Sequence, residues 1–121
     1  MSVPALILEK NMKLALDAGF AAAFDGAPEC YFSAPGRTEI GGNHTDHQRG
    51  RVLAGAVNLD TVAAVKCNGT NIIRIQSKGY PLSVVDLSNL TPVESEINST
   101  PSLIRGVAAR FTELGCKVEG F

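Results

Sequence analysis

Apolar and polar positions alternate along the first part of the chain with the period of a helix. Leu8, Met12 and Leu16 recur every four residues, and charged side chains stand between them. This pattern predicts a helix over about Val3–Phe24. The glycine and proline in the run from Gly26 to Pro28 are typical of a helix end.

The middle of the chain has the composition of β-structure. Tyr31–Ser33 is a short strand candidate, and the glycine-rich stretch Pro35–His47 that follows it is expected to be a loop. Val52–Val57 and Thr61–Val65 combine β-branched and small apolar residues, which predicts two further strands. We therefore expect strands on both sides of a polar loop.

The clearest hairpin signal lies further along. Asn71–Gln76 and Leu82–Asp86 are apolar runs on either side of Lys78 and Gly79, a pair of residues typical of a turn. With the preceding candidates, this gives four or five strands between two helices.

A second helix is predicted near the C-terminus. Thr100 is a candidate N-cap, Pro101 suits the first helical position, and Gly115 marks the end. An apolar stripe runs along the helix through Leu103, Val107, Phe111 and Leu114, and we expect Phe111 and Leu114 in the core. Cys116–Phe121 then has the pattern of a strand beginning, so the sequence is expected to be a fragment.

Composition narrows the class of partner. The 121 residues carry a net charge of -1, with 45% hydrophobic and 19% charged residues, as in one ordinary globular domain. Nucleic-acid binding needs clustered Lys and Arg, which this balance does not supply. No run has the length of a membrane span, and the apolar N-terminal stretch lacks the basic start of a signal peptide. We expect a cytoplasmic protein with a small-molecule or protein partner.

The cysteines give no framework. Cys30, Cys67 and Cys116 are an odd number at wide spacings, which indicates neither disulfides nor a zinc knuckle. A reducing compartment fits them, and we expect each to behave as a small buried apolar residue.

The side chains best suited to catalysis or ligand binding are concentrated between Pro35 and His47. Arg37 offers a permanent charge that can stabilise developing negative charge. His44 and Asp46 are two residues apart, so in an extended segment their side chains project to one side and can meet neighbouring hydroxyls. The pattern predicts recognition of a polyhydroxylated ligand. The glycines either let the backbone approach that ligand or supply turns with positive φ.

Two other interpretations of this stretch remain open. In one, His44, Asp46 and His47 bind zinc, since residues 42–47 resemble the H-x-H-x-D-H stretch of metallo-β-lactamase-like hydrolases. Gly42 stands where the first histidine of that motif belongs, and the chain has only two histidines. In the other, the loop merely caps the sheet, and Arg37 pairs with Asp46.

Several separated motifs carry a more extensive resemblance. The chain from about Tyr31 to Phe121 resembles the galactokinases. The matching runs are Ala34–Arg37, His44–Asp46, Val52–Leu53, Asn58–Thr61 and the helical step Ser102–Val107. Three positions depart from the usual family pattern, which has asparagine at Glu39, glutamate at Asn43 and tyrosine at His47.

The resemblance implies a fold and a reaction. Galactokinases are GHMP kinases, whose first domain resembles domain 2 of ribosomal protein S5: an α+β fold with a mixed β-sheet and helices packed on one side. Residues 1–121 would form the N-terminal part of that domain. The family phosphorylates the anomeric hydroxyl of galactose with ATP and Mg²⁺. Its phosphate-binding loop, base and second domain would follow Phe121, so we expect this chain alone to lack kinase activity.

The resemblance also implies roles for residues. Arg37 would lie near the anomeric hydroxyl and the catalytic base. The other sugar contacts would come from Asn43, His44, Thr45 and Asp46, with Glu39 as a further candidate. Ser77 would lie near the adenine of ATP. An alternative within the same family is a galactose sensor that keeps the sugar site without catalysis.

Overall fold

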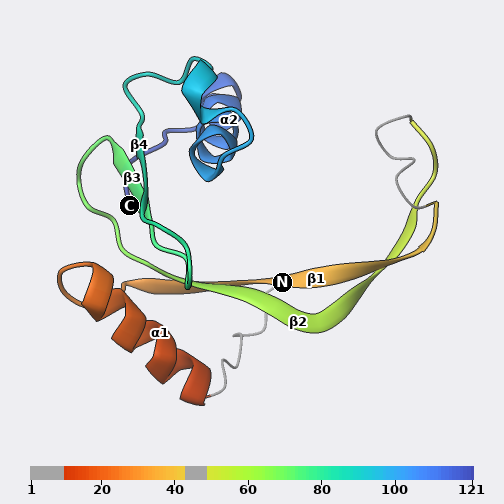
Figure 1. The fold of residues 1–121 in the computed structure, drawn as a ribbon, viewed down its shortest axis with the longest axis horizontal. Coiled ribbons are helices and arrows are strands. Elements are labelled where there is room, and N and C mark those ends of the chain that lie inside the picture. Colours follow the sequence, from red (N-terminus) through yellow and green to blue (C-terminus); the bar gives the residue numbers. More distant parts are fainter. Residues whose placement is uncertain (1–9, 43–48) are drawn as a thin grey trace. The chain divides into compact units, whose positions relative to one another are not determined.

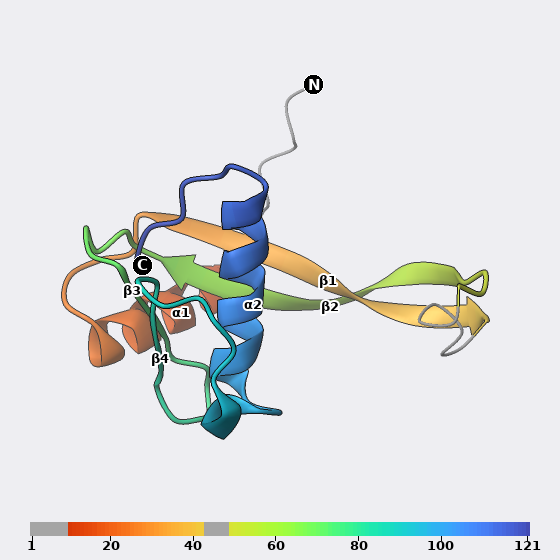
Figure 2. The same ribbon diagram turned by 90° about the horizontal axis from the view of Figure 1, so that it is seen from above.

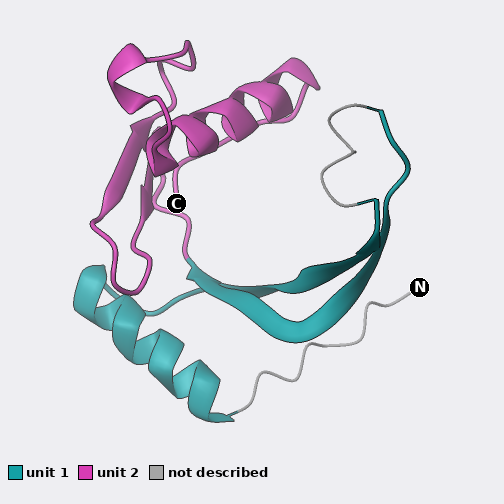
Figure 3. Ribbon diagram, turned by 45° about the vertical axis from the view of Figure 1, so that its right-hand side comes forward, with its two compact units in different colours: residues 1–65 teal, residues 66–121 magenta. Residues whose placement is uncertain are grey.

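The computed structural model describes residues 10–42 and 49–121. The chain divides into two compact units, Met1–Val65 and Lys66–Phe121, which are coloured separately in Figure 3.

The first unit begins with helix α1, Lys10–Ala23. Its sequence is rich in alanine and leucine, the strongest helix formers, so local propensity supports the helix. The helix predicted over Val3–Phe24 is thus confirmed from Lys10 onward, and its first part lies outside the described residues. Gly26 has a φ of 84°, which confirms the predicted stop.

A polar cluster joins α1 to the first strand. Lys13 Nζ donates to Asp17 Oδ2 at 2.8 Å and to the Tyr31 hydroxyl at 2.9 Å. The Tyr31 hydroxyl in turn donates to Asp17 Oδ1, and the ammonium lies 4.7 Å from the centroid of the tyrosine ring. Hydrogen bonds from Lys13 and Tyr31 hold the pKa of Asp17 below its usual value. These contacts fix the start of the strand against the helix.

Strands β1, Cys30–Gly41, and β2, Leu53–Val65, form a long antiparallel hairpin (Figures 1 and 2). The pairing runs from Cys30 opposite Val65 to Gly41 opposite Leu53. Two predictions were therefore wrong. The first part of the glycine-rich stretch is strand rather than loop, and the two strands expected over residues 52–65 are one.

Cross-strand pairing explains this difference. Gly36 is a turn former by local propensity, yet a Cβ there would lie 3.1 Å from the carbonyl oxygen of Leu59. The glycine therefore permits a close approach of the two strands instead of turning the chain. Earlier in β1, the Ser33 hydroxyl donates to Asp60 Oδ2 across the hairpin. Such contacts depend on the partner strand and are not encoded in a local pattern.

The second unit contains the predicted hairpin. Strands β3, Ile72–Ile75, and β4, Ser83–Asp86, pair antiparallel with Ile73 opposite Val85. Gly79 in the turn has a φ of 84°, as the sequence indicated. Ile73 and Val85 are buried together with Ala108 of the following helix, and they form the core of this unit.

Helix α2, Thr100–Glu113, is confirmed, with two corrections. Ser99 rather than Thr100 occupies the N-cap position, and no side chain caps the helix there. Gly115, with a φ of 81°, ends the helix as predicted. The second correction concerns its faces: the predicted apolar stripe is exposed, at 70% for Leu103, 50% for Val107, 51% for Phe111 and 62% for Leu114. Phe111 and Leu114 are therefore not core residues.

Arg105 and Ala108 are the buried residues of α2. Arg105 is only 7% exposed and reaches back to the connection that precedes the helix. Its Nε and Nη2 donate to the carboxylate of Glu96 at 2.9 and 2.8 Å, and its Nη1 donates to the carbonyl oxygens of Asp86 and Asn89. Glu96 belongs to the 3-10 helix η2, Glu94–Glu96. This buried guanidinium selects the inward face of α2.

The expected strand over Cys116–Phe121 is not formed, although the segment is bound to β3 and to the turn before it. Gly120 N donates to Thr70 O at 2.8 Å, and Arg74 N donates to Phe121 O at 2.9 Å. The prediction that the cysteines are buried was also wrong, since Cys30, Cys67 and Cys116 are all exposed.

The α+β class is confirmed. In the described part of the chain, all strand pairing is antiparallel and lies in two separate two-stranded sheets, β1–β2 and β3–β4, so the single mixed sheet that the resemblance implied is not observed there. The assignment to the S5-like GHMP fold stays a prediction. Among the residues that the structure describes, neither α1 nor α2 has the length and apolar composition of a membrane-spanning helix.

Candidate functional site

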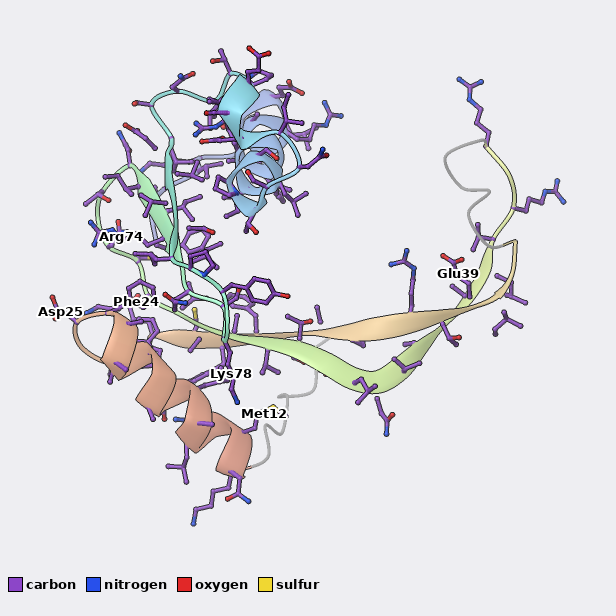
Figure 4. The ribbon with its side chains drawn as sticks, viewed as in Figure 1. Met12, Phe24, Asp25, Glu39, Arg74 and Lys78 are labelled. Carbon is purple, nitrogen blue, oxygen red and sulfur yellow. The ribbon has the colours of Figure 1, made fainter. Side chains whose placement is uncertain are left out.

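Arg37 and Glu39 lie on the distal half of the β1–β2 hairpin, and Figure 4 labels Glu39 there. They are two residues apart in a strand, so their side chains project to the same face. Arg37 Nη2 lies 3.8 Å from Glu39 Oε1. The arginine side chain is 70% exposed and the glutamate side chain 20%. The site therefore presents a guanidinium to solvent beside a largely covered carboxylate.

The surrounding strand is irregular on both sides of this pair. The register of β1 against β2 shifts between Pro35 and Arg37, and again between Glu39 and Gly41. Irregularities of this kind redirect side chains and are common beside functional sites. They bracket a short regular stretch that carries both charged residues.

The remaining predicted sugar contacts lie outside the described residues: Asn43, His44, Thr45 and Asp46, together with His47 of the zinc interpretation. They belong to the connection between the paired ends of β1 and β2. Gly42, where that connection begins, has a φ of 79°, and a Cβ there would lie 2.1 Å from the carbonyl oxygen of Arg51. This glycine both turns the chain and permits a close backbone approach.

Ser77, the predicted adenine contact, follows β3 in the second unit. Its carbonyl oxygen accepts hydrogen bonds from Gln76 Nε2 at 3.1 Å and from Tyr80 N at 3.1 Å. Ser77 is thus part of an ordered, exposed turn. Its role toward a nucleotide stays a prediction.

Sequence reasoning missed the polar pairs that organise the two units. Ser33–Asp60 crosses the hairpin, and Arg105–Glu96 holds the connection before α2. An arginine between apolar helical positions, with a glutamate nine residues earlier, was the available signal for the second pair. Among the described residues, no group of three His, Cys, Asp or Glu side chains is arranged to hold a metal ion.

Comparison with known proteins bears directly on the hairpin. Residues 18–67 match the family model described as the galactokinase galactose-binding signature. The chain carries the galactokinase galactose-binding signature. The match spans Arg37 and Glu39 as well as the connection that holds the other predicted sugar contacts.

Relatives named galactokinase extend the similarity. The chain is 39% identical over 70 residues to the galactokinase of Lacticaseibacillus casei (strain BL23), an alignment of 57% of this chain and 18% of the relative. It is 26% identical over 108 residues to the galactokinase of Streptococcus mutans, covering 88% of this chain and 28% of the relative. The chain thus spans less than a third of the length of these galactokinases. No solved structure matches it significantly.

Proposed function

We propose that the chain is the sugar-binding portion of a galactokinase, an enzyme that phosphorylates galactose at its anomeric hydroxyl using ATP. The observation that carries this proposal is the match of residues 18–67 to the galactose-binding signature. The exposed guanidinium of Arg37 on the hairpin supports it, because such a group is available to an incoming polar ligand.

In this proposal the polar and charged side chains contact different parts of the sugar. Arg37 lies near the anomeric hydroxyl, where its charge holds the base ionised and stabilises the transition state. His44 and Asp46 bind hydroxyls on the other side of the sugar, and Asn43 and Thr45 assist them. Phosphoryl transfer depends mainly on positioning and charge stabilisation, so a site that holds the sugar contributes directly to the rate.

ATP with Mg²⁺ would supply the phosphoryl group when bound. The described residues offer no carboxylate cluster for the metal, and Ser77 is the candidate that this chain provides for the nucleotide. The task proposed for the hairpin residues is therefore to hold galactose.

Galactose binding by the 121-residue chain tests the proposal. We expect titration with galactose to shift the amide resonances of residues 36–47 in ¹⁵N–¹H NMR spectra, and glucose to do so more weakly. Asp46→Asn should weaken galactose binding about 10-fold or more, because a hydrogen bond to a charged acceptor contributes about 1.5–3 kcal/mol.

Asp25→Asn is the matched control, since it makes the same chemical change in the same unit outside the hairpin. It should leave galactose binding unchanged. Shifts that are identical for galactose and glucose, or that avoid the hairpin, would contradict the proposal. A zinc-dependent titration abolished by a chelator would instead support the metal interpretation.

A further inference from the structure

We propose that Glu39 is a positioning residue that acts on the sugar through Arg37 rather than by contacting the sugar itself. The inference rests on the proposed function. It concerns a residue at which this chain departs from the usual family pattern, so its role does not follow from the galactokinase signature.

The side chains of Arg37 and Glu39 differ in their exposure to solvent. Glu39 is 20% exposed, whereas Arg37 is 70% exposed. A carboxylate that is largely covered requires a compensating partner, and Arg37 Nη2 lies within ion-pair distance of it at 3.8 Å. The covered Glu39 is therefore suited to hold Arg37 in place, and the exposed Arg37 is suited to contact a ligand.

The residues directly opposite on β2 are too small to restrict the Arg37 side chain, whereas Glu39 can do so. Arg37 pairs with Ala56 and Glu39 with Ala54, so no side chain larger than a methyl group stands directly across from either residue. A long arginine side chain without such a neighbour keeps much of its rotamer freedom, which costs free energy when a ligand immobilises it. An adjacent carboxylate on the same face reduces that freedom before the ligand arrives.

The geometry also leaves Arg37 able to bind. A separation of 3.8 Å is an ion pair and not a hydrogen bond. The contact joins Nη2 of the guanidinium to one carboxylate oxygen, and a guanidinium has five N–H donors. Glu39 can thus orient the group while its donors remain available to an anionic or hydroxyl oxygen.

The motion of Arg37 tests this role without any sugar. We expect Glu39→Gln, which removes the charge and keeps the shape, to lower the NMR order parameter of the Arg37 Nε–Hε bond. Glu94→Gln makes the same change in η2 of the other unit and should leave that order parameter unchanged. An Arg37 side chain equally ordered with and without the Glu39 charge would overturn the proposal.

A double-mutant cycle on galactose binding then separates an indirect effect from a direct contact. In the wild-type background, Glu39→Gln should weaken binding about threefold, the small effect expected of an ion pair whose cation is exposed to solvent. In the Arg37→Ala background the same change should have no effect. An equal loss in both backgrounds would mean that Glu39 contacts the sugar, and the positioning role would be wrong.

The two measurements also distinguish this inference from the proposed function. A wild-type chain that does not bind galactose contradicts the proposed function, and the Arg37 order parameter still decides whether Glu39 positions it. If Arg37→Ala abolishes measurable binding, the order parameter again decides alone. Binding of galactose together with an unaffected Arg37 would sustain the function and remove the positioning role.

Discussion

Within the second unit, Gly120 is the residue at which the fold most clearly requires the absence of a side chain. It is buried in the second unit, and its amide donates to Thr70 O at 2.8 Å. A Cβ at this position would lie 2.4 Å from Ile72 O, 2.6 Å from Thr70 O and 2.7 Å from Asn68 Oδ1. Two of these atoms are backbone oxygens, so relief would require the backbone beside β3 to move.

We therefore expect Gly120→Ala to destabilise the protein by about 1–3 kcal/mol, as overpacking typically does. Gly106→Ala is the matched control. Gly106 lies inside α2, and a Cβ there would have no neighbouring atom within 4 Å, so alanine should stabilise by about 0.4–1 kcal/mol. Urea unfolding monitored by circular dichroism should show shifts of opposite sign. Equal shifts would mean that the packing around Gly120 is not as described.

At the scale of elements, Arg105 ties the segment between β4 and α2 to the helix. The guanidinium binds the Glu96 carboxylate with two hydrogen bonds and also reaches backbone oxygens of Asp86 and Asn89. Hydrogen bonding from Arg105 holds the pKa of Glu96 below its usual value of 4.5. Two-point binding of this kind is stronger than an exposed pair of long side chains.

Arg105→Met should therefore reduce the free energy of unfolding about three times as much as Arg110→Met does, because the Arg110–Glu113 pair is exposed. The lowered pKa of Glu96 determines how the stability changes as the pH falls. A carboxylate with a depressed folded-state pKa stabilises fully above its unfolded value, near 4.5, and loses that contribution as pH falls through the folded value. The stability difference between wild type and Glu96→Gln should thus shrink between pH 6 and 3. A difference independent of pH would contradict the role of the ion pair.

The exposed stripe of α2 makes a second prediction about this element. Leu103 is 70% exposed, whereas Ile73 of β3 is 2% exposed. Leu103→Ala should cost less than about 1 kcal/mol, and Ile73→Ala about 2–5 kcal/mol. Thermal unfolding of the two variants measures the contrast. A cost at Leu103 as large as that at Ile73 would show that the stripe is packed, as the sequence pattern first indicated.

The extent of sequence prediction follows from how local each signal is. The β3–β4 hairpin and both helices were predictable because Gly79, Gly115 and the helical apolar period act within a few residues. The length of β1 was not, because Gly36 is held by the opposite strand. The buried face of α2 was missed because the Arg105 contacts compete with the apolar stripe. For the candidate site, the sequence pattern predicted Arg37 and the family resemblance added Glu39. Both roles stay predictions, and the unequal burial of the two side chains required coordinates.

At the scale of the whole molecule, the chain combines a small net charge with exposed apolar surface. The net charge of -1 leaves little electrostatic repulsion between copies, and the isoelectric point is near 6.1. The apolar stripe of α2 adds contiguous exposed side chains, which favour association in water. Charge and surface therefore act in the same direction.

We expect the chain to self-associate in a concentration-dependent way, most strongly near pH 6 and less at pH 8, where its negative charge is larger. Leu103→Gln combined with Phe111→Gln should reduce association at pH 6, because both side chains are at least half exposed. The matched control is Ile40→Gln, which removes an exposed apolar side chain from the hairpin instead. Sedimentation velocity over a concentration series measures the effect. A chain that stays monomeric at pH 6, or an equal response to the control, would show that α2 is not the surface responsible.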